Sequence, residues 1–140
     1  MKTTVTYPLA KDTPVSHRPF SPAVRVGDLI FVSGQASVDL TGKIIPDTFE
    51  GEFRRSIENL RKVLETAGSD LKHVIQTRNY VRDSANVERY NELYREYFSV
   101  PYPTRTTITN CLPPAIQYEV ECAAVAKSSS PLPPIRPTPN

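Results

Sequence analysis

Hydrophobic and polar residues alternate with two different periods along this chain. Residues 23–32, AVRVGDLIFV, hold two short runs of strand formers around a Gly27-Asp28 turn, which predicts a β-hairpin. The DLTGK segment at 39–43 predicts a further turn. From Asp47 onward the apolar residues recur every three or four positions, which is the period of an amphipathic helix. Its buried stripe would be Phe49, Phe53, Ile57, Leu60 and Leu64, and Gly68 would end the helix in a left-handed cap.

The second half of the chain returns to strand-like patterns around one more helix. Residues 73–81 are rich in β-branched and aromatic side chains and predict a strand. A helix capped near Ser84 or Asn86 should follow, with the buried stripe Val87, Tyr90, Leu93, Tyr94, Tyr97 and Phe98. Two strands, at about 105–110 and 116–126, complete the pattern, and we expect them to pair as a broad hairpin.

The predicted element order, ββ-α-β-α-ββ, indicates an α+β fold. A single mixed β-sheet with both helices packed on one face would bury all the apolar patterns at once. The other face of that sheet would stay uncovered in a single chain, so we expect a partner subunit and an oligomer.

Composition limits what the chain can be. Its 140 residues suit one domain, expected at residues 1–126, followed by a Pro/Ser-rich tail at 127–140. Basic and acidic residues nearly balance, 17 against 15, so we expect neither a nucleic-acid partner nor a membrane partner. Since the N-terminus lacks a secretory signal and only two cysteines occur, we expect a cytoplasmic protein with reduced thiols. No metal-ligand spacing occurs, and no metal is expected.

One arginine stands at the start of a predicted strand, in PYPTRTTIT at 101–109. A guanidinium is costly to bury unless a negative group meets it, so Arg105 needs a partner. If the last two strands pair, Arg105 could approach Glu119 and form an internal salt bridge. Alternatively, Arg105 binds the carboxylate of a ligand while Glu119 positions water or transfers a proton. His17 and Arg78 are interpreted as a solvated loop residue and a surface or interface cation.

Four separated blocks of the sequence resemble the Rid family of reactive intermediate deaminases, also called YjgF. They are PFSPAVRVGDLIFVSGQASVDLTGK, ENLRKVLETAGSDLKHVIQT, YNELYREYF and PTRTTI…LPPAIQYEVECAAV, and the match runs from about Pro19 to Val125. The resemblance implies a homotrimer with a barrel-like centre and sites in the clefts between subunits. It also implies hydrolysis of enamine and imine intermediates such as 2-aminoacrylate to a 2-keto acid and ammonia, with no cofactor.

The resemblance also implies roles for individual residues. Arg105 would bind the substrate carboxylate and Glu119 would position the attacking water. The remaining expected substrate-binding residues are Phe20, Ser33, Gly34, Asn91 and Thr107. Phe20 stands where a tyrosine is common in the family, and Thr107 where a cysteine is often found, so a phenolic hydroxyl and a thiol are missing.

The sequence therefore predicts an enamine/imine deaminase of the 2-iminobutanoate/2-iminopropanoate type, acting on a small imino acid. One alternative is a member of the same family that binds a small carboxylate without converting it, which Phe20 and Thr107 would favour. A ribonuclease or translation inhibitor ranks last, because the charge is near neutral and no stripe of basic and aromatic residues occurs.

Overall fold

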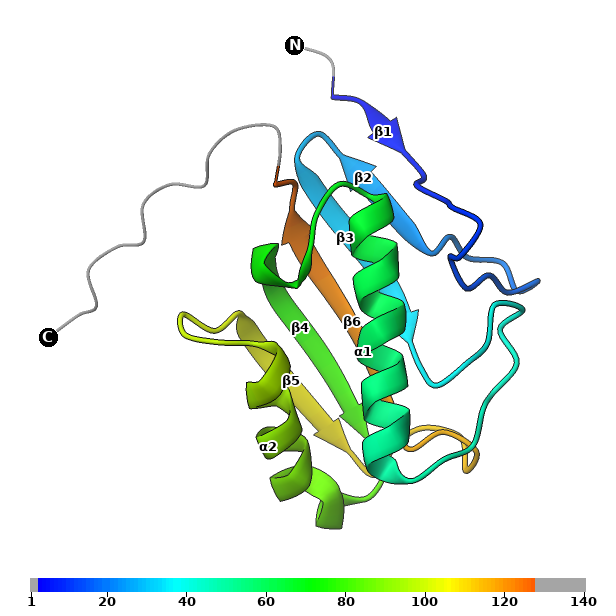
Figure 1. Cartoon of the computed structure of the whole chain (residues 1–140), viewed down its shortest axis with the longest axis vertical. Helices are drawn as coiled ribbons and strands as arrows, with labels where there is room; N and C mark the ends of the chain where they lie inside the picture. The colour runs from blue at the N-terminus through cyan, green and yellow to red at the C-terminus, as the bar shows by residue number, and fades with distance from the viewer. Residues whose placement is uncertain (1–2, 128–140) are drawn as a thin grey trace, which may run out of the picture.

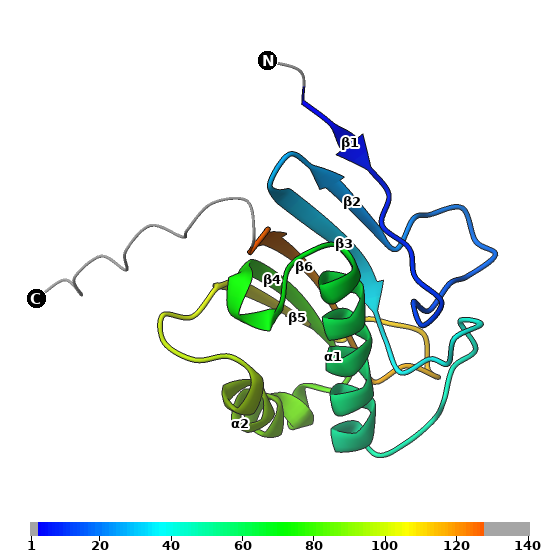
Figure 2. The ribbon, with the colours of Figure 1, turned by 45° about the horizontal axis from the view of Figure 1, so that its top comes forward.

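The computed structural model describes residues 3–127, which form one six-stranded mixed sheet with two α-helices. The elements in chain order are β1 (Val5–Thr6), β2 (Ala23–Val26), β3 (Leu29–Gln35), α1 (Phe49–Thr66), the 3₁₀ turn η1 (Leu71–His73), β4 (Val74–Val81), the 3₁₀ turn η2 (Ser84–Asn86), α2 (Val87–Tyr97), β5 (Thr104–Thr109) and β6 (Tyr118–Val125). The strands lie in the order β1-β2-β3-β6-β4-β5. Figures 1 and 2 show both helices on the same face of this sheet, which confirms the predicted α+β fold.

The turn predicted at Gly27 and the cap predicted at Gly68 are confirmed, whereas the cap predicted near Ser84 or Asn86 is confirmed only in position, since Asn86 precedes α2 but makes no capping hydrogen bond with its side chain. Strands β2 and β3 pair as the predicted hairpin, and Gly27 in their turn has a φ of 59°. Thr48 caps α1, since its hydroxyl accepts a hydrogen bond from the Gly51 amide at 3.1 Å. Gly68, with a φ of 90°, follows the end of α1 as expected. Strand β1 was not predicted; its two exposed residues carry no periodic signal.

The prediction that the last two strands pair as a hairpin is wrong. Strand β4 lies between them and pairs in parallel with β5 and antiparallel with β6. Helix α2 connects β4 to β5 as a crossover, and a crossover returns the chain parallel to the strand it left. The loop between Thr109 and Tyr118 then carries the chain past β4, so that β6 enters the sheet between β3 and β4.

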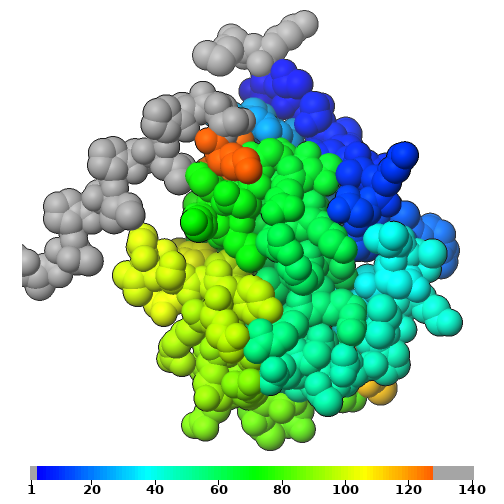
Figure 3. All heavy atoms as spheres, in the orientation of Figure 1, coloured from blue at the N-terminus to red at the C-terminus, as the bar shows by residue number. Residues whose placement is uncertain are grey.

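The two faces of the sheet differ in how well they are covered. The helix-covered face holds the core, where side chains such as Phe53, Ile57 and Tyr118 are fully buried. Figure 3 shows α1 and α2 lying over this face. The opposite face exposes 49% of Phe31, 46% of Ile75 and 42% of Ile108. A single chain therefore leaves one sheet face uncovered, as expected, while the oligomer itself stays a prediction.

Several smaller expectations can be placed on the structure. Cys122 is buried in the core and Cys111 is half-buried, and neither forms a disulfide. Within residues 3–127, no helix has the length and apolar character needed to cross a bilayer. No cluster of acidic, histidine and cysteine side chains suited to a metal ion occurs in the same range. The predicted tail at 127–140 lies, apart from Lys127, outside the described residues.

Candidate functional site

A β-bulge in β3 shapes the region around Glu119. Val32 pairs with Cys122 and Gln35 pairs with Val120, so β3 has one more residue between the two pairs than β6 has. The extra residue falls at Ser33-Gly34, and such a bulge bends its strand and interrupts the regular pairing. The bulge therefore lies beside the part of β6 that carries Glu119.

Gly34 lets the Glu119 carboxyl group lie directly against the backbone of β3. A Cβ atom on Gly34 would come within 2.9 Å of Glu119 Oε2 and 3.0 Å of its Cδ. Both distances are shorter than ordinary van der Waals contact, so any larger residue would displace the carboxyl group. A glycine is needed here for close approach, and this gives the Ser-Gly pair a physical role.

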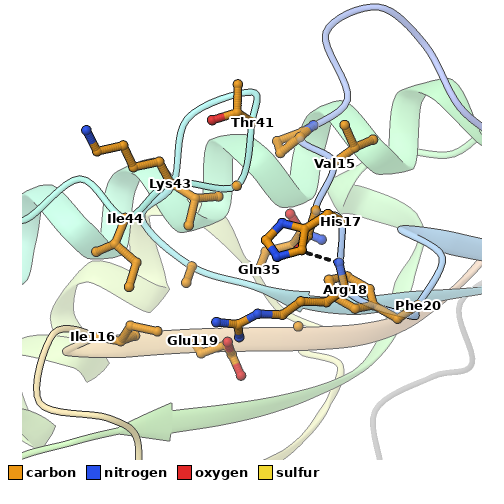
Figure 4. A pocket seen from close by; sticks show the side chains of 16 residues that line it. Val15, His17, Arg18, Phe20, Gln35, Thr41, Lys43, Ile44, Ile116 and Glu119 are labelled. Atoms are coloured by element: carbon orange, nitrogen blue, oxygen red, sulfur yellow. Dashed lines mark hydrogen bonds between the residues drawn. The ribbon is translucent and has the colours of Figure 1, made fainter.

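Glu119 lies at the wall of a cavity of about 320 Å³ between the N-terminal loop, the segment after β3 and the start of β6 (Figure 4). We call this the Glu119 cavity; its lining includes His17, Arg18, Phe20, Gly34, Lys43 and Glu119. Burial, and secondarily the charge of Glu121, raises the pKa of the Glu119 carboxyl above its ordinary value. No ion pair or hydrogen bond occupies this carboxyl among residues 3–127, so it is free to act as a base.

The neighbouring Glu121 is engaged differently, although it shares the open sheet face with Glu119. It accepts a hydrogen bond from the Tyr80 hydroxyl on β4, and this carboxylate raises the pKa of Tyr80 to about 12. Glu121 is thus paired within the sheet, whereas Glu119 is not.

A buried carboxylate fixes the chain just before Glu119. Glu52 in the first turn of α1 is only 2% exposed. It accepts hydrogen bonds from the Gln117 amide at 3.0 Å and from Gln117 Nε2 at 2.8 Å. The Asp47 amide donates to the same carboxylate at 3.3 Å. Helix α1 therefore holds the residue two positions before Glu119, which limits how far the start of β6 can shift.

Arg105 is held by aromatic rings rather than by an acid. Its guanidinium carbon lies 4.9 Å from the ring centre of Tyr90 and 4.9 Å from that of Tyr94, both on α2. Cation–π contacts of this kind stabilise a guanidinium without using its hydrogen-bond donors. Within residues 3–127, Arg105 forms no ion pair with any acidic side chain.

A second cavity, of about 250 Å³, lies at this guanidinium. We call it the Arg105 cavity; it is lined by Asn91, Tyr94, Arg95, Tyr102 and Arg105. An arginine fork with free donors is suited to bind a carboxylate in bidentate fashion. The side-chain amide of Asn91 adds a neutral polar group that can bind either a donor or an acceptor.

Buried hydrogen bonds fix the ring of Tyr94 under Arg105. The Tyr94 hydroxyl lies 2.8 Å from Thr77 Oγ1, which accepts from Asn79 Nδ2 at 3.0 Å. Asn79 Oδ1 in turn accepts from the Tyr118 hydroxyl at 2.6 Å. Tyr118 is fully buried, and burial raises its pKa well above the ordinary value, so it remains a neutral donor. The network gives the aromatic platform a defined position.

The structure separates the two residues that carry the expected chemistry. Arg105 points toward α2 on the helix-covered face, whereas Glu119 alternates with the buried residues Tyr118 and Val120 and therefore points to the opposite face. The prediction of an internal salt bridge between Arg105 and Glu119 is therefore wrong. Any site that uses both must combine groups from opposite faces of the sheet.

The other expected residues divide between the two cavities. Phe20 and Gly34 line the Glu119 cavity, and Asn91 lines the Arg105 cavity. Ser33 and Thr107 line neither one. The Ser33 hydroxyl donates to the Ser21 carbonyl at 2.6 Å, and the Thr107 hydroxyl lies 2.8 Å from the Tyr90 hydroxyl. Both hydroxyls are therefore structural in the single chain.

Sequence reasoning missed the residues that position the two charged groups. Tyr90 and Tyr94 are four residues apart on the buried stripe of α2, which indicates core packing and nothing more. Their contact with Arg105 follows only when β5 is known to lie under α2. Arg18 was not predicted to line the Glu119 cavity, and His17, interpreted as a solvated loop residue, also lines it.

Proteins of known sequence or structure resemble this chain over most of its length. "Protein mmf2, mitochondrial" from Schizosaccharomyces pombe is 37% identical over 110 residues, which is 76% of this chain and 86% of that protein. The mouse protein named "2-iminobutanoate/2-iminopropanoate deaminase" is 32% identical over 114 residues, covering 80% of this chain and 84% of the relative. The crystal structure of Escherichia coli TdcF with bound serine has a TM-score of 0.77 at 28% identity, over 87% of this chain and 99% of TdcF.

The relatives leave some expectations open. A relative named as mitochondrial means that a cytoplasmic location stays a prediction.

The family profile described as "Endoribonuclease L-PSP" matches residues 10–126. Since this profile spans most of the chain and relatives above 30% identity cover it widely, the chain belongs to the Endoribonuclease L-PSP family, which is the Rid or YjgF family that its four sequence blocks resemble.

Proposed function

We propose that this protein is an imine deaminase that hydrolyses a small imino acid or its enamine tautomer to a 2-keto acid and ammonia. One observation carries the proposal: an arginine and a glutamate, each without an ionic partner in residues 3–127, stand at two cavities on opposite faces of one sheet. The name of the mouse relative, a 2-iminobutanoate/2-iminopropanoate deaminase, supports this type of substrate.

The proposed active form is a homotrimer with its sites between subunits. In a ring of identical copies, each interface joins one face of a copy to a different face of the next. Such a ring can bring the Arg105 cavity of one copy to the Glu119 cavity of its neighbour. The uncovered sheet face, with Phe31, Ile75 and Ile108 exposed, is the apolar surface that this assembly would bury.

In this site Arg105 binds the substrate carboxylate with its guanidinium fork, and Glu119 acts on water. Glu119 accepts a proton from the water as the oxygen adds to the C=N carbon of the protonated imine, which gives a neutral carbinolamine. Glu119 then returns that proton to nitrogen. As the hydroxyl oxygen forms the carbonyl, the C–N bond breaks, Glu119 takes the hydroxyl proton, and this proton leaves with ammonia as ammonium. A carboxyl whose pKa is raised by burial suits these transfers, because its pKa is closer to the working pH.

No cofactor is needed for this hydrolysis. The overall change consumes one water and one imine and releases one keto acid and one ammonia, so no electrons are exchanged. Positioning the carboxylate and the water contributes by holding the reacting atoms in contact, while proton transfer by Glu119 accelerates the reaction by about 10² to 10⁴-fold.

Complementation between two inactive variants tests the proposal. Arg105→Ala and Glu119→Gln are expected to lose ammonia release from freshly generated imino acid, measured with a coupled assay. When the two variants are refolded together in equal amounts, some interfaces join an intact Arg105 to an intact Glu119. Random mixing in a ring of three restores about one quarter of the wild-type activity.

The controls separate assembly from chemistry. Each variant refolded alone must stay inactive and keep the wild-type sedimentation behaviour. If Arg105→Ala keeps full activity, the proposed role of the guanidinium is wrong. If the mixture is no more active than its parents although the copies have exchanged, the site does not lie between subunits.

A second candidate is a protein that binds a small carboxylate without converting it. Phe20 favours it, because the aromatic residue at the Glu119 cavity carries no hydroxyl to assist proton transfer. Thermal protection by small 2-keto acids without ammonia release from any imine would support this candidate. The ribonuclease named in the family description has no comparable support, since basic and acidic residues nearly balance, 17 against 15.

A further inference from the structure

The Glu119 cavity contains an excess of basic side chains. His17, Arg18 and Lys43 line it, and Glu119 is the one acidic residue among its lining side chains. Across the described part of the chain, none of these three basic groups forms an ion pair. A small cavity lined by the positively charged side chains of Arg18 and Lys43 is suited to hold an anionic group of a ligand.

Among the three, Arg18 is the one directed across the cavity. Figure 4 shows its side chain extending toward Ile116 and Glu119, whereas the Lys43 side chain extends away from Glu119. The loop that carries Arg18 is fixed by local hydrogen bonds. The Arg18 amide donates to Ser16 Oγ at 3.1 Å, and the Phe20 amide donates to the Arg18 carbonyl at 2.8 Å. Arg18 and Phe20 thus project from one tight turn at the cavity.

Arg18 does not neutralise Glu119. No ion pair joins them, and a guanidinium in contact with the carboxyl would lower its pKa. Burial instead raises the pKa of Glu119, and the charge of Glu121 adds to that shift. The guanidinium of Arg18 is therefore available to a ligand placed beside Glu119.

From these contacts we infer that the preferred substrate carries a second carboxylate, as in the imine of an acidic amino acid. This inference rests on the proposed function, in which Arg105 of a neighbouring copy binds the α-carboxylate and Glu119 directs water to the C=N carbon. Arg18 then binds the carboxylate of the side chain. The hydrolysis is unchanged: water adds at the C=N carbon, ammonia leaves, and the product is a 2-keto dicarboxylic acid.

The cavity volume supports a small diacid. About 320 Å³ is near the lower end of the range for ligand pockets, roughly 300 to 1,000 Å³, and leaves room for a short chain rather than a large anion. Two guanidinium groups on either side of the reacting carbon would fix both ends of such a substrate. Fixing both ends orients the C=N bond better than a single contact does.

The test compares imines of matched chain length. Amino acid oxidases generate imines from glutamate and norvaline, and from aspartate and 2-aminobutanoate, in the presence of the protein. The acidic member of each pair should have a kcat/KM at least about tenfold higher than the neutral one, as expected for a charge-assisted contact. Arg18→Ala should remove this preference, because it should lower kcat/KM for the acidic imines much more than for the neutral ones.

Lys43→Ala is the matched control, because it removes a positive charge from the same cavity wall without removing the side chain that points at Glu119. It should retain most of the preference. Arg18→Lys should keep part of it, since the charge remains but the bidentate geometry is lost. If neutral and acidic imines are hydrolysed equally well, or if Arg18→Ala affects both alike, this inference is overturned and the proposed function stands.

Binding measurements separate this inference from the proposed function. If no imine is hydrolysed, the proposed function fails, and calorimetry with 2-oxoglutarate and 2-oxopentanoate decides the remaining question. Tighter binding of the diacid that is lost in Arg18→Ala supports the second carboxylate contact. Equal binding of the two acids, or an affinity for the diacid that Arg18→Ala does not change, overturns it.

Discussion

The Glu119 cavity and the Arg105 cavity differ in how each holds the charged residue after which it is named. Within residues 3–127 Glu119 has no cationic partner, and burial raises its pKa, so the protein makes its ionised form less favourable. Arg105 has no anionic partner in the same described range, but its guanidinium carbon lies 4.9 Å from the ring centres of both Tyr90 and Tyr94. Glu119 is therefore suited to exchange a proton, whereas Arg105 is suited to keep its positive charge.

The comparison explains why the two groups lie on opposite faces. If Arg105 and Glu119 met within one chain, they would pair, the pKa of Glu119 would fall, and neither group would be free for a ligand. With β4 between β5 and β6, and side chains alternating between faces, one chain cannot form that pair. In the proposed homotrimer, each chain would therefore contribute Arg105 to one site and Glu119 to another.

The walls of the two cavities also differ. The Arg105 cavity is built on α2 and the edge strand β5, with its platform held by buried hydrogen bonds. The Glu119 cavity is built largely from loops, including the turn that carries Arg18 and Phe20. Loops can change in sequence without disturbing a core. We therefore expect Arg105 to bind the α-carboxylate of any substrate, and the loops of the Glu119 cavity to determine which substrate side chain fits.

The largest effect is expected from removing the acid. Glu119→Gln keeps the shape of the side chain but cannot accept a proton from water, so kcat should fall by about 10² to 10⁴-fold. The same variant should be more thermally stable than the wild type at neutral pH, because a half-buried charge has been removed. Activity and melting temperature should thus change in opposite directions. Unchanged activity would show that another group activates the water.

The pH dependence of that stability gain has a defined sign. The folded chain binds the Glu119 proton more tightly than the unfolded chain, so this contribution to stability is full below the unfolded pKa. It is lost as the pH rises through the raised folded pKa. The melting temperature of Glu119→Gln should therefore exceed that of the wild type more at pH 8 than at pH 4. A constant difference across this range would contradict the raised pKa.

Much of the fold was predictable because its signals are local. The apolar stripe from Phe49 to Leu64, the Gly27 turn and the Gly68 cap each depend on neighbouring residues and were confirmed. The order of the strands was not predictable in the same way. Nothing in the TRTTIT or YEVECAAV segments shows that β6 inserts between β3 and β4, since that choice depends on how all strands pack together.

The sequence pattern predicted which residues of the last strand share a face, but it did not predict the geometry of the candidate site. Alternation along β6 correctly placed Glu119 and Glu121 on one face and Val120 and Cys122 on the other. The same reasoning could not say which face of the sheet Arg105 shares, because that depends on the parallel pairing of β4 with β5. The Ser33-Gly34 bulge and its contact with Glu119 depend on a register shift that no local pattern announces.

A smaller effect is expected from crowding the acid rather than removing it. Gly34→Ala would place a methyl group 2.9 Å from the position of Glu119 Oε2, and the flexible carboxyl end must move. A displacement of this size should lower kcat by about tenfold to a hundredfold, with little loss of stability. Adding Gly34→Ala to Glu119→Gln should lower kcat no further, because Gly34→Ala acts only by displacing the side chain at position 119. Independent, additive losses would mean that Gly34 has another role.

The smallest effect is expected at the Arg105 cavity, where the change removes a ring that supports Arg105 but leaves the guanidinium itself in place. Tyr94→Leu takes away one of the two rings under the guanidinium, and a cation–π contact of about 1 kcal/mol corresponds to a rise in KM of about fivefold. The value of kcat should change less, because Glu119 is untouched. Tyr94→Phe is the matched control, since it keeps the ring and loses only the hydroxyl bonded to Thr77 at 2.8 Å. Its KM should stay within about twofold of the wild type. If the Leu and Phe variants raise KM equally, the hydroxyl network, and not the ring face, holds Arg105 in place.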